Sequence, residues 1–320
     1  MADISIITEK IVFLGVFALI GFVSTFLKYT KPTLSEGIST TLTRLTIPAL
    51  VISSFSTLDM DAQRLKNGLL MLIISYLLIF FLIFLGKLCA KFLGLRGVTA
   101  SAHTYLTACG NVTFMGYPII TAILGTEGLY YAMLYVLAND TVIWVLSVYS
   151  IAKCTGKKHE NMLKKLLNPS TISLLLGFLV MLFNVKFPPA ILSPMQTLGA
   201  CTIPLSMIFI GITLATIKFS KLLNCLKGFV IVLVKMLLVP GVLISLMPLF
   251  DSFGIISATG IVVLILQCAM PSTSIYAVLS KTYGGDPEYA AQNIMITTVM
   301  SFFTIPFIYY LITNFNGIGL

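Results

Sequence analysis

Apolar residues follow one another in long runs along this chain, and polar residues gather in the short segments between the runs. A run of about 20 apolar residues is long enough for an α-helix to cross a hydrocarbon core about 30 Å thick. We count ten such runs and predict a membrane-spanning helix for each of them. The ten predicted spans are residues 8–27, 36–56, 67–90, 98–123, 128–152, 169–185, 192–216, 227–248, 254–280 and 288–313.

Composition excludes a water-soluble protein. Of the 320 residues, 58% are hydrophobic and 10% are charged, whereas a soluble domain has about 25% charged residues. The first run is flanked by Asp3, Glu9 and Lys10 and is followed by no A-x-A cleavage site. We therefore expect a retained helix rather than a signal peptide. The predicted fold class is an all-α polytopic membrane protein with ten transmembrane helices.

The net charge of +9 reflects topology rather than binding to nucleic acid. With ten spans, successive loops lie on alternate sides of the membrane. Fifteen of the 20 Lys and Arg residues fall on the side opposite the termini, and the positive-inside rule makes that side cytoplasmic. We expect a multi-pass protein of the cytoplasmic membrane with both termini extracytoplasmic. The other five basic residues are Lys10, Arg64, Lys66 and Lys186 on the terminal side, and Lys235 within a span.

Two halves of the chain share weak similarity in a constant order. Two pairs of stretches align at an offset of 156 residues and a third pair aligns at 159. This regularity predicts an internal repeat. Each half has five spans, so the second half would enter the membrane inverted, as in many secondary transporters. The aligned pairs are LIGFVSTFLKYTKP (19–32) with LLGFLVMLFNVKFP (175–188), TIP (46–48) with TIP (202–204), and LGTEGLYYA (124–132) with YGGDPEYAA (283–291).

The repeat predicts three segments: a first five-helix repeat at 1–152, a cytoplasmic linker at 153–168 and a second, inverted repeat at 169–320. The linker is the most charged stretch of the chain and is too short to form a domain. Pro48 and Pro204 lie within the second span of each half, where proline kinks a helix. These kinks either serve helix packing or line a transport path.

Predicted spans 4 and 9, at matching places in the two halves, are both interrupted by proline and small polar residues. They contain CGNVTFMGYPII (109–120) and QCAMPSTSIYAVLSK (267–281). Irregular backbone at membrane depth is tolerated only where it is buried in protein or lines a wet cavity. Interrupted spans at matching positions point to the binding site of a transporter. We expect Gly116 and Pro118 to break span 4 and Pro271 to break span 9.

A broken helix exposes N–H groups and a partial positive charge inside the bilayer, which suits an anion. Nearby amides and hydroxyls add directed donors. The alternative is a pair of proline kinks joined by interhelical hydrogen bonds. The predicted substrate-binding residues are Gly110, Asn111, Thr113, Gly116, Pro118, Gln267, Pro271, Ser272, Thr273 and Ser274.

Few ionisable residues lie deep in the predicted spans, and such residues indicate function by default. Asp140 either couples transport to a proton or cation, or serves as a structural hydrogen-bond partner. Lys235 forms an ion pair, supports the site electrostatically, or extends to the interface. Gln292 and Asn293, like Gln267, complete a polar cage or pair between helices. His103, near the start of span 4, is expected at the interface.

At this point the residues resemble a known family. GNVTFMGYPIITAILG (110–125) and AMPSTSIYAVLSKTYGGDPEYAAQNIMITTVMSFFTIP (269–306) resemble the signatures of the auxin efflux carrier family. The ten-span layout extends the resemblance over the whole chain. Plant PIN-type members often have a long central loop, whereas the short linker here is similar to that of bacterial members.

The resemblance implies a fold similar to that of sodium/bile-acid symporters and NhaA-like sodium/proton antiporters, with broken helices 4 and 9 crossing. Spans 1, 2, 6 and 7 would form a scaffold, and spans 3–5 and 8–10 a transport core. A small organic anion, such as auxin or a mono- or dicarboxylate, would bind at the crossover and move by an elevator-like shift. Family members often have a basic residue before the proline that follows Lys235. Proton or sodium coupling and a homodimer are further expectations.

Other functions fit the residues less well. A cation/proton antiporter usually needs clustered core carboxylates, and here only Asp140 lies deep in a span. An intramembrane enzyme needs clustered His, Asp, Glu or an activated Ser, and a channel does not explain the inverted repeat. The six cysteines form no C-x-x-C pair, and no G-x-x-x-x-G-K-[ST] motif is present. We expect a transporter without enzymatic activity, metal, cofactor or direct use of ATP.

Overall fold

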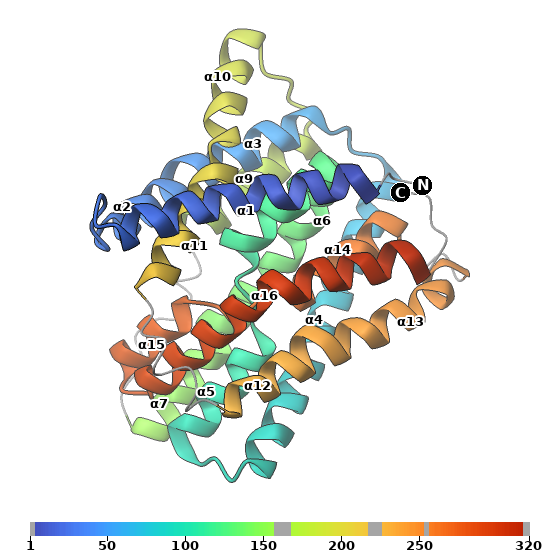
Figure 1. Ribbon diagram of the computed structural model, residues 1–320. Coiled ribbons are helices and arrows are strands. Elements are labelled where there is room, and N and C mark those ends of the chain that lie inside the picture. The colour runs from blue at the N-terminus through green and yellow to red at the C-terminus, as the bar shows by residue number, and fades with distance from the viewer. Residues whose placement is uncertain (1–3, 157–167, 217–225, 253–255, 316–320) are drawn as a thin grey trace.

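The protein is helical wherever its structure is described. The computed structural model describes residues 4–156, 168–216, 226–252 and 256–315. In these ranges the regular secondary structure is helical, and the one strand-like feature is an isolated antiparallel bridge between Gly110 and Ser272. The predicted all-α class is therefore confirmed for the described residues (Figure 1). The predicted linker overlaps the end of one helix, and its residues 157–167 lie outside the described ranges.

Fifteen α-helices are described, several of them continued by a turn of π-helix. The π-helical turns are η1 (Leu42–Thr46), η2 (Val112–Gly116), η3 (Val142–Ser147) and η5 (Val232–Leu238). The α-helices are α1 (Ile4–Phe26), α2 (Leu34–Thr41), α3 (Ile47–Thr57), α4 (Ala62–Phe92), α5 (Gly97–Ala108), α6 (Tyr117–Thr141), α7 (Val148–Thr155), α9 (Pro169–Leu182), α10 (Pro189–Ala200), α11 (Thr202–Ala215), α12 (Leu226–Ile231), α13 (Val239–Ser252), α14 (Ala258–Ala269), α15 (Ile275–Tyr283) and α16 (Pro287–Phe315).

Six helical stretches in the described residues are long and apolar enough to cross a membrane. They are Leu34–Thr57, Ala62–Phe92, Val112–Thr155, Pro189–Ala215, Lys227–Phe250 and Pro287–Asn314. Shorter apolar helices cover Val12–Phe26, Pro169–Leu182 and Ala258–Ala269. The stretch Val112–Thr155 is bent at Gly125, whose φ of 63° lies in the left-handed region that glycine adopts without strain. Together these segments make a polytopic membrane protein.

Two helix pairs pack closely, and each pair consists of one helix from the first half of the chain and one from the second half. α1 of the first half packs along α11 of the second, and α9 of the second packs along α3 of the first. Gly21 of α1 lies against the Ile208 backbone, while Gly177 of α9 lies against the Phe55 ring. These two glycines align at the 156-residue offset of the predicted repeat. Close helix approach at small residues is typical of packing in lipid.

The helices gather in two groups (Figure 1). α1, α2, α3, α9, α10 and α11 lie together in the upper part of the view, and α5, α7, α12, α15 and α16 lie below them. The start of α1 and the end of α16 lie at the same side of the molecule.

Gly21→Ala should destabilise the protein, because a Cβ there would overlap the carbonyl oxygen of Ile208. Overpacking of this kind costs about 1–3 kcal/mol, so the melting temperature in detergent should fall. Gly15→Ala on the same helix is the matched control, since a Cβ at Gly15 meets no atom within 4 Å. Equal melting temperatures for the two variants would show that α1 does not depend on close contact with α11.

Candidate functional site

Two unwound segments cross at the centre of the candidate site. α5 ends at Ala108, and Cys109 is extended with φ −104° and ψ 133°. α14 ends at Ala269, and Met270 is extended with φ −61° and ψ 145°. The segments that follow run antiparallel and pair through their backbones. The Asn111 N–H donates to the Pro271 carbonyl at 2.7 Å, and the Thr273 N–H donates to the Cys109 carbonyl at 3.3 Å.

Side chains from α6 and α16 satisfy the remaining amides of the bridge. The Gly110 N–H donates to Asn139 Oδ1 at 3.1 Å, and the Ser272 N–H donates to Thr297 Oγ1 at 3.1 Å. The Ser272 hydroxyl donates to the Leu106 carbonyl at 2.8 Å. Sequence analysis missed both Asn139 and Thr297. Their spacing was an available signal, because it is close to the offset of the repeat.

The predicted position of the break in span 4 was wrong. Gly116 has helical φ −66° and ψ −50°, and Pro118 lies in the first turn of α6, which continues η2 within the helical stretch Val112–Thr155. The helix is interrupted earlier, between Cys109 and Asn111. Gly116 instead makes room for the Gln267 side chain, because a Cβ there would lie 3.0 Å from Gln267 Cδ.

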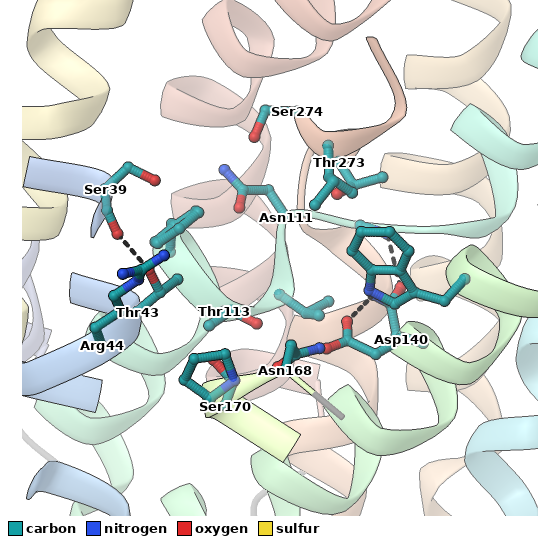
Figure 2. A pocket seen from close by; sticks show the side chains of 17 residues that line it. Ser39, Thr43, Arg44, Asn111, Thr113, Asp140, Asn168, Ser170, Thr273 and Ser274 are labelled. Carbon is teal, nitrogen blue, oxygen red and sulfur yellow. Dashed lines mark hydrogen bonds between the residues drawn. The ribbon is translucent and has the colours of Figure 1, made fainter. Parts of the chain in front are cut away.

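A cavity of about 410 Å³ reaches the crossing segments. It brings together five of the predicted substrate-binding residues. In Figure 2, Asn111 and Thr113 lie between Arg44 on one side and Asp140 on the other. The cavity is lined by Ser39, Thr43, Arg44, Gly110, Asn111, Val112, Thr113, Phe114, Asn139, Asp140, Trp144, Asn168, Pro169, Ser170, Thr273, Ser274 and Ile275.

Arg44 is the one basic residue that lines this cavity in the described part of the chain. Arg44 is one of the fifteen basic residues that sequence analysis counted on the cytoplasmic side, with the loop residues. In the structure it belongs to η1, inside the continuous helical stretch Leu34–Thr57. Its place four residues before Pro48, within a predicted span, was the signal that could have marked it. Its guanidinium gives the cavity a permanent positive charge.

Asp140 supplies the cavity's one carboxylate among the described residues. Asn139 Nδ2 donates to Asp140 Oδ1 at 3.4 Å, and the Asn168 amide points toward the same carboxylate (Figure 2). Asn168 also caps α9, since its Oδ1 accepts from the Thr171 N–H at 3.0 Å. Asp140 therefore lines the cavity, as a coupling role requires, and has hydrogen-bonding neighbours, as a structural role requires.

Lys235 lies behind the crossing segments rather than in the cavity. It is 1% exposed, so it does not extend to the interface. Its Nζ has no hydrogen-bond partner among the described residues, and no described carboxylate pairs with it. A Cβ at Gly110 would lie 3.3 Å from this Nζ. The ammonium therefore sits against the bridge, where α5 and α14 present the partial negative charge of their C-terminal ends.

The predicted amides lie apart from the cavity. Gln267 is buried, and neither its Oε1 nor its Nε2 has a partner among the described residues. Asn293 Nδ2 donates to the Tyr289 carbonyl of its own helix at 2.6 Å. Gln292 lines a second cavity of about 460 Å³ that shares Ser274 with the first. Sequence analysis expected these three side chains to complete one polar cage or to pair between helices. In the structure none of them lines the first cavity, and only Gln292 lines the second.

His103 is fully buried, so the prediction of an interfacial position was wrong. Its Nδ1 lies 2.8 Å from the Tyr289 hydroxyl. The Nε2 atom is buried without a partner among the described residues. α16 covers the ring, which the position of His103 near the start of a span could not reveal.

Asn139→Ala should destabilise the protein, because it leaves the buried Gly110 N–H without an acceptor. Such a loss costs about 1–3 kcal/mol, which a thermal-melting assay in detergent detects. Asn314→Ala is the control, since Asn314 is exposed and bonds only within its own helix. An unchanged melting temperature for Asn139→Ala would show that the cap does not hold the bridge.

In comparisons with known proteins, this chain matches a family of membrane transport proteins and two relatives that are named as transporters. The profile of the family described as membrane transport protein matches residues 6–162 and 158–309. An uncharacterized transporter of Methanocaldococcus jannaschii is 25% identical over 236 residues, which cover 68% of this chain and 74% of the relative. An uncharacterized transporter of Methanothermobacter thermautotrophicus is 23% identical over 300 residues, covering 93% and 96%. With nearly all of its spans inside the family match, the chain belongs to the membrane transport protein family of the auxin efflux carriers.

Proposed function

We propose that this protein is a secondary transporter of a small organic anion, which binds in the cavity at the crossing segments. The observation that carries the proposal is the cavity itself, where Arg44 and Asn111 face the same space as the broken backbone. Its volume of about 410 Å³ lies within the range of small-molecule sites. The transporter names of the two relatives support the general activity.

The start of η2 adds to the preference for an anion. Val112, Thr113 and Phe114 form its first turn and all line the cavity. N–H groups in a first helical turn lack intrahelical acceptors, and the helix dipole makes this end positive. A carboxylate placed there would receive backbone donors, the Asn111 amide and the Arg44 guanidinium. Lys235 would add positive potential from behind the bridge.

The proposed architecture has ten spans in two inverted five-helix repeats. Two observations support it. Gly21 and Gly177 occupy equivalent positions in the two helix pairs that join the halves, and Asn139 and Thr297 cap equivalent sides of the bridge. The first repeat is 1–152 and the second is 169–320, joined by the linker 153–168. We keep the outward termini and the homodimer as parts of this proposal.

The proposed movement is an elevator-like shift between a scaffold (spans 1, 2, 6 and 7) and a core (spans 3–5 and 8–10). The cavity lies between these groups: Arg44 and Asn168 come from scaffold elements, and Asn111, Asp140 and Ser274 come from core elements. A ligand held by both groups would be released as one slides along the other. Alternating access of this kind is general among carriers with inverted repeats.

A cation/proton antiporter is the second candidate, because Asp140 faces the same cavity as the crossing segments. A buried carboxylate that reaches a wet cavity can carry a proton or coordinate a cation. Arg44 argues against a cation as the main substrate, since it would repel one in the same space. The two functions differ in which species accumulates in proteoliposomes.

Asn111→Ala and Arg44→Gln should each weaken substrate binding. A hydrogen bond to a charged ligand contributes roughly 1.5–3 kcal/mol, which corresponds to about 10- to 150-fold in affinity. A thermal-shift screen of purified protein against mono- and dicarboxylates would first identify a ligand by its concentration-dependent stabilisation. Titration of that ligand into each variant, and uptake in proteoliposomes, then measure the loss.

Matched controls separate a binding defect from a folding defect. Ser53→Ala removes a buried hydroxyl that bonds only to the Leu50 carbonyl of its own helix, and Lys28→Gln removes an exposed cation. Both should bind the ligand as the wild-type protein does. Wild-type affinity in both Asn111→Ala and Arg44→Gln would contradict the proposed site.

Asp140→Asn should change the pH or cation dependence of transport if Asp140 carries the coupling charge. The substitution keeps the shape and removes the ionisable group. Uptake is measured at several pH values, with and without a sodium gradient. A normal rate with unchanged dependence would assign Asp140 to the hydrogen-bond network with Asn139 and Asn168. Loss of all cation-driven flux, with no anion uptake in the wild type, would favour the antiporter.

A further inference from the structure

A third cavity, of about 480 Å³, lies where α4 ends and α5 begins. Three basic residues line it: Lys87 and Lys91 from the last turns of α4, and Arg96 from the connecting turn. All three are exposed. This cavity shares no lining residue with the crossover cavity, so the proposed transport function does not account for it.

The turn that connects α4 to α5 places Arg96 at the same cavity as Lys87 and Lys91 of α4. Gly94 and Gly97 have φ of 67° and 55°, which ordinary side chains rarely adopt. A Cβ at either glycine would meet no atom within 4 Å, so both positions are open and the glycines serve the turn geometry. Arg96 and Gly97 line the cavity together, and no side chain caps the first turn of α5.

The positive charges are not neutralised by the described part of the protein. The one ion pair found there joins Lys186 to Asp59, away from this turn. Asp286, the acidic residue bonded to the first turn of α5, is already engaged: it accepts from the Thr99 hydroxyl at 2.7 Å and the Tyr289 N–H at 3.0 Å. Among the described residues, no carboxylate therefore pairs with the three cations or with the uncapped start of α5 at this cavity.

The cavity floor offers hydroxyl groups as well. Ser101 and Thr104 line it and are 7% and 4% exposed. The Ser101 hydroxyl lies 2.8 Å from that of Ser150, which also lines the cavity. The Thr104 hydroxyl already donates to the Ala100 carbonyl at 2.8 Å, whereas the paired Ser101 and Ser150 hydroxyls keep one hydrogen between them for a ligand. Cations, the uncapped first turn of α5 and this hydroxyl pair together suit a phosphate group.

The surroundings of the cavity favour a lipid over a soluble phosphate. Phe84, Leu88 and Phe92 follow the same end of α4 and are 60%, 39% and 82% exposed. These side chains face the hydrocarbon in a membrane-spanning helix. A lipid bound here would place its headgroup among Lys87, Lys91 and Arg96 and its acyl chains along this apolar row. Basic pockets between transmembrane helices bind anionic headgroups in this way.

We propose that the cavity between α4 and α5 is a binding site for the headgroup of an anionic phospholipid. The basic residues of this turn belong to the side that the positive-inside rule makes cytoplasmic, so the lipid would come from the cytoplasmic leaflet. The site would hold the end of α4 at the membrane surface.

The test compares lipids on delipidated protein in neutral detergent. Dioleoylphosphatidylglycerol and dioleoylphosphatidylcholine are titrated in mixed micelles, and binding is followed by native mass spectrometry and melting temperature. Wild-type protein should bind the anionic lipid preferentially and be stabilised by it. Each basic residue near an anionic surface contributes about fivefold, so Lys87→Gln/Lys91→Gln/Arg96→Gln should lose about 100-fold in affinity.

A matched control removes the same charge elsewhere. Lys28→Gln/Lys31→Gln/Lys281→Gln removes three exposed cations of the same predicted side and should keep wild-type lipid affinity. Lys87→Arg/Lys91→Arg should also keep it. Both triple variants should melt like the wild type without lipid.

Three outcomes would overturn the proposal. They are equal binding of the two lipids, equal losses in the two triple variants, and equal stabilisation by millimolar glycerol 3-phosphate or inorganic phosphate. The last result would assign the cavity to a soluble phosphate compound.

Discussion

The fold depends on how two stretches of unwound backbone are satisfied inside the membrane. An unpaired amide or carbonyl in hydrocarbon costs several kcal/mol, so neither α5 nor α14 could end where it does alone. The Gly110–Ser272 bridge solves this by pairing each segment with the other. Asn139 and Thr297 accept from the N–H groups that face away from the pairing. A single helix break would leave backbone groups without partners, whereas two breaks side by side satisfy each other through hydrogen bonds.

The polar groups required by the bridge also create the conditions for binding. Once the helices stop at the crossing, the first turn of η2 begins there, and its residues line the cavity. Lys235 lies on the other side of the bridge, and its Nζ has no hydrogen-bond partner in the described part of the chain. The unwound backbone therefore has two consequences: it needs hydrogen-bond partners, and it lets a helix begin beside the cavity. The residues at the bridge and at the start of η2 are therefore needed both for the fold and for the proposed binding site.

The sequence predicted the helical class, the interrupted spans and many residues near the crossing. These follow from composition and from helix-breaking residues, which act locally. It misplaced the break in span 4, because Pro118 looks like an interruption but lies in the first turn of α6. It also counted Arg44 with the basic residues of the cytoplasmic loops, although Arg44 lies in predicted span 36–56, and it expected His103 at an interface. In each case the local residue pattern was ambiguous, and only the neighbouring helices determined the position.

The sequence by itself determined that the chain must cross a membrane repeatedly, since runs of apolar residues have no other stable environment. It also determined where the helices could not continue. Only the tertiary structure decided which groups meet at those places: Asn139 at Gly110, Thr297 at Ser272, and Gln267 against Gly116. These contacts join residues far apart in the chain. Their selection depends on close packing between helices, which a local pattern of hydrophobic and polar residues does not encode.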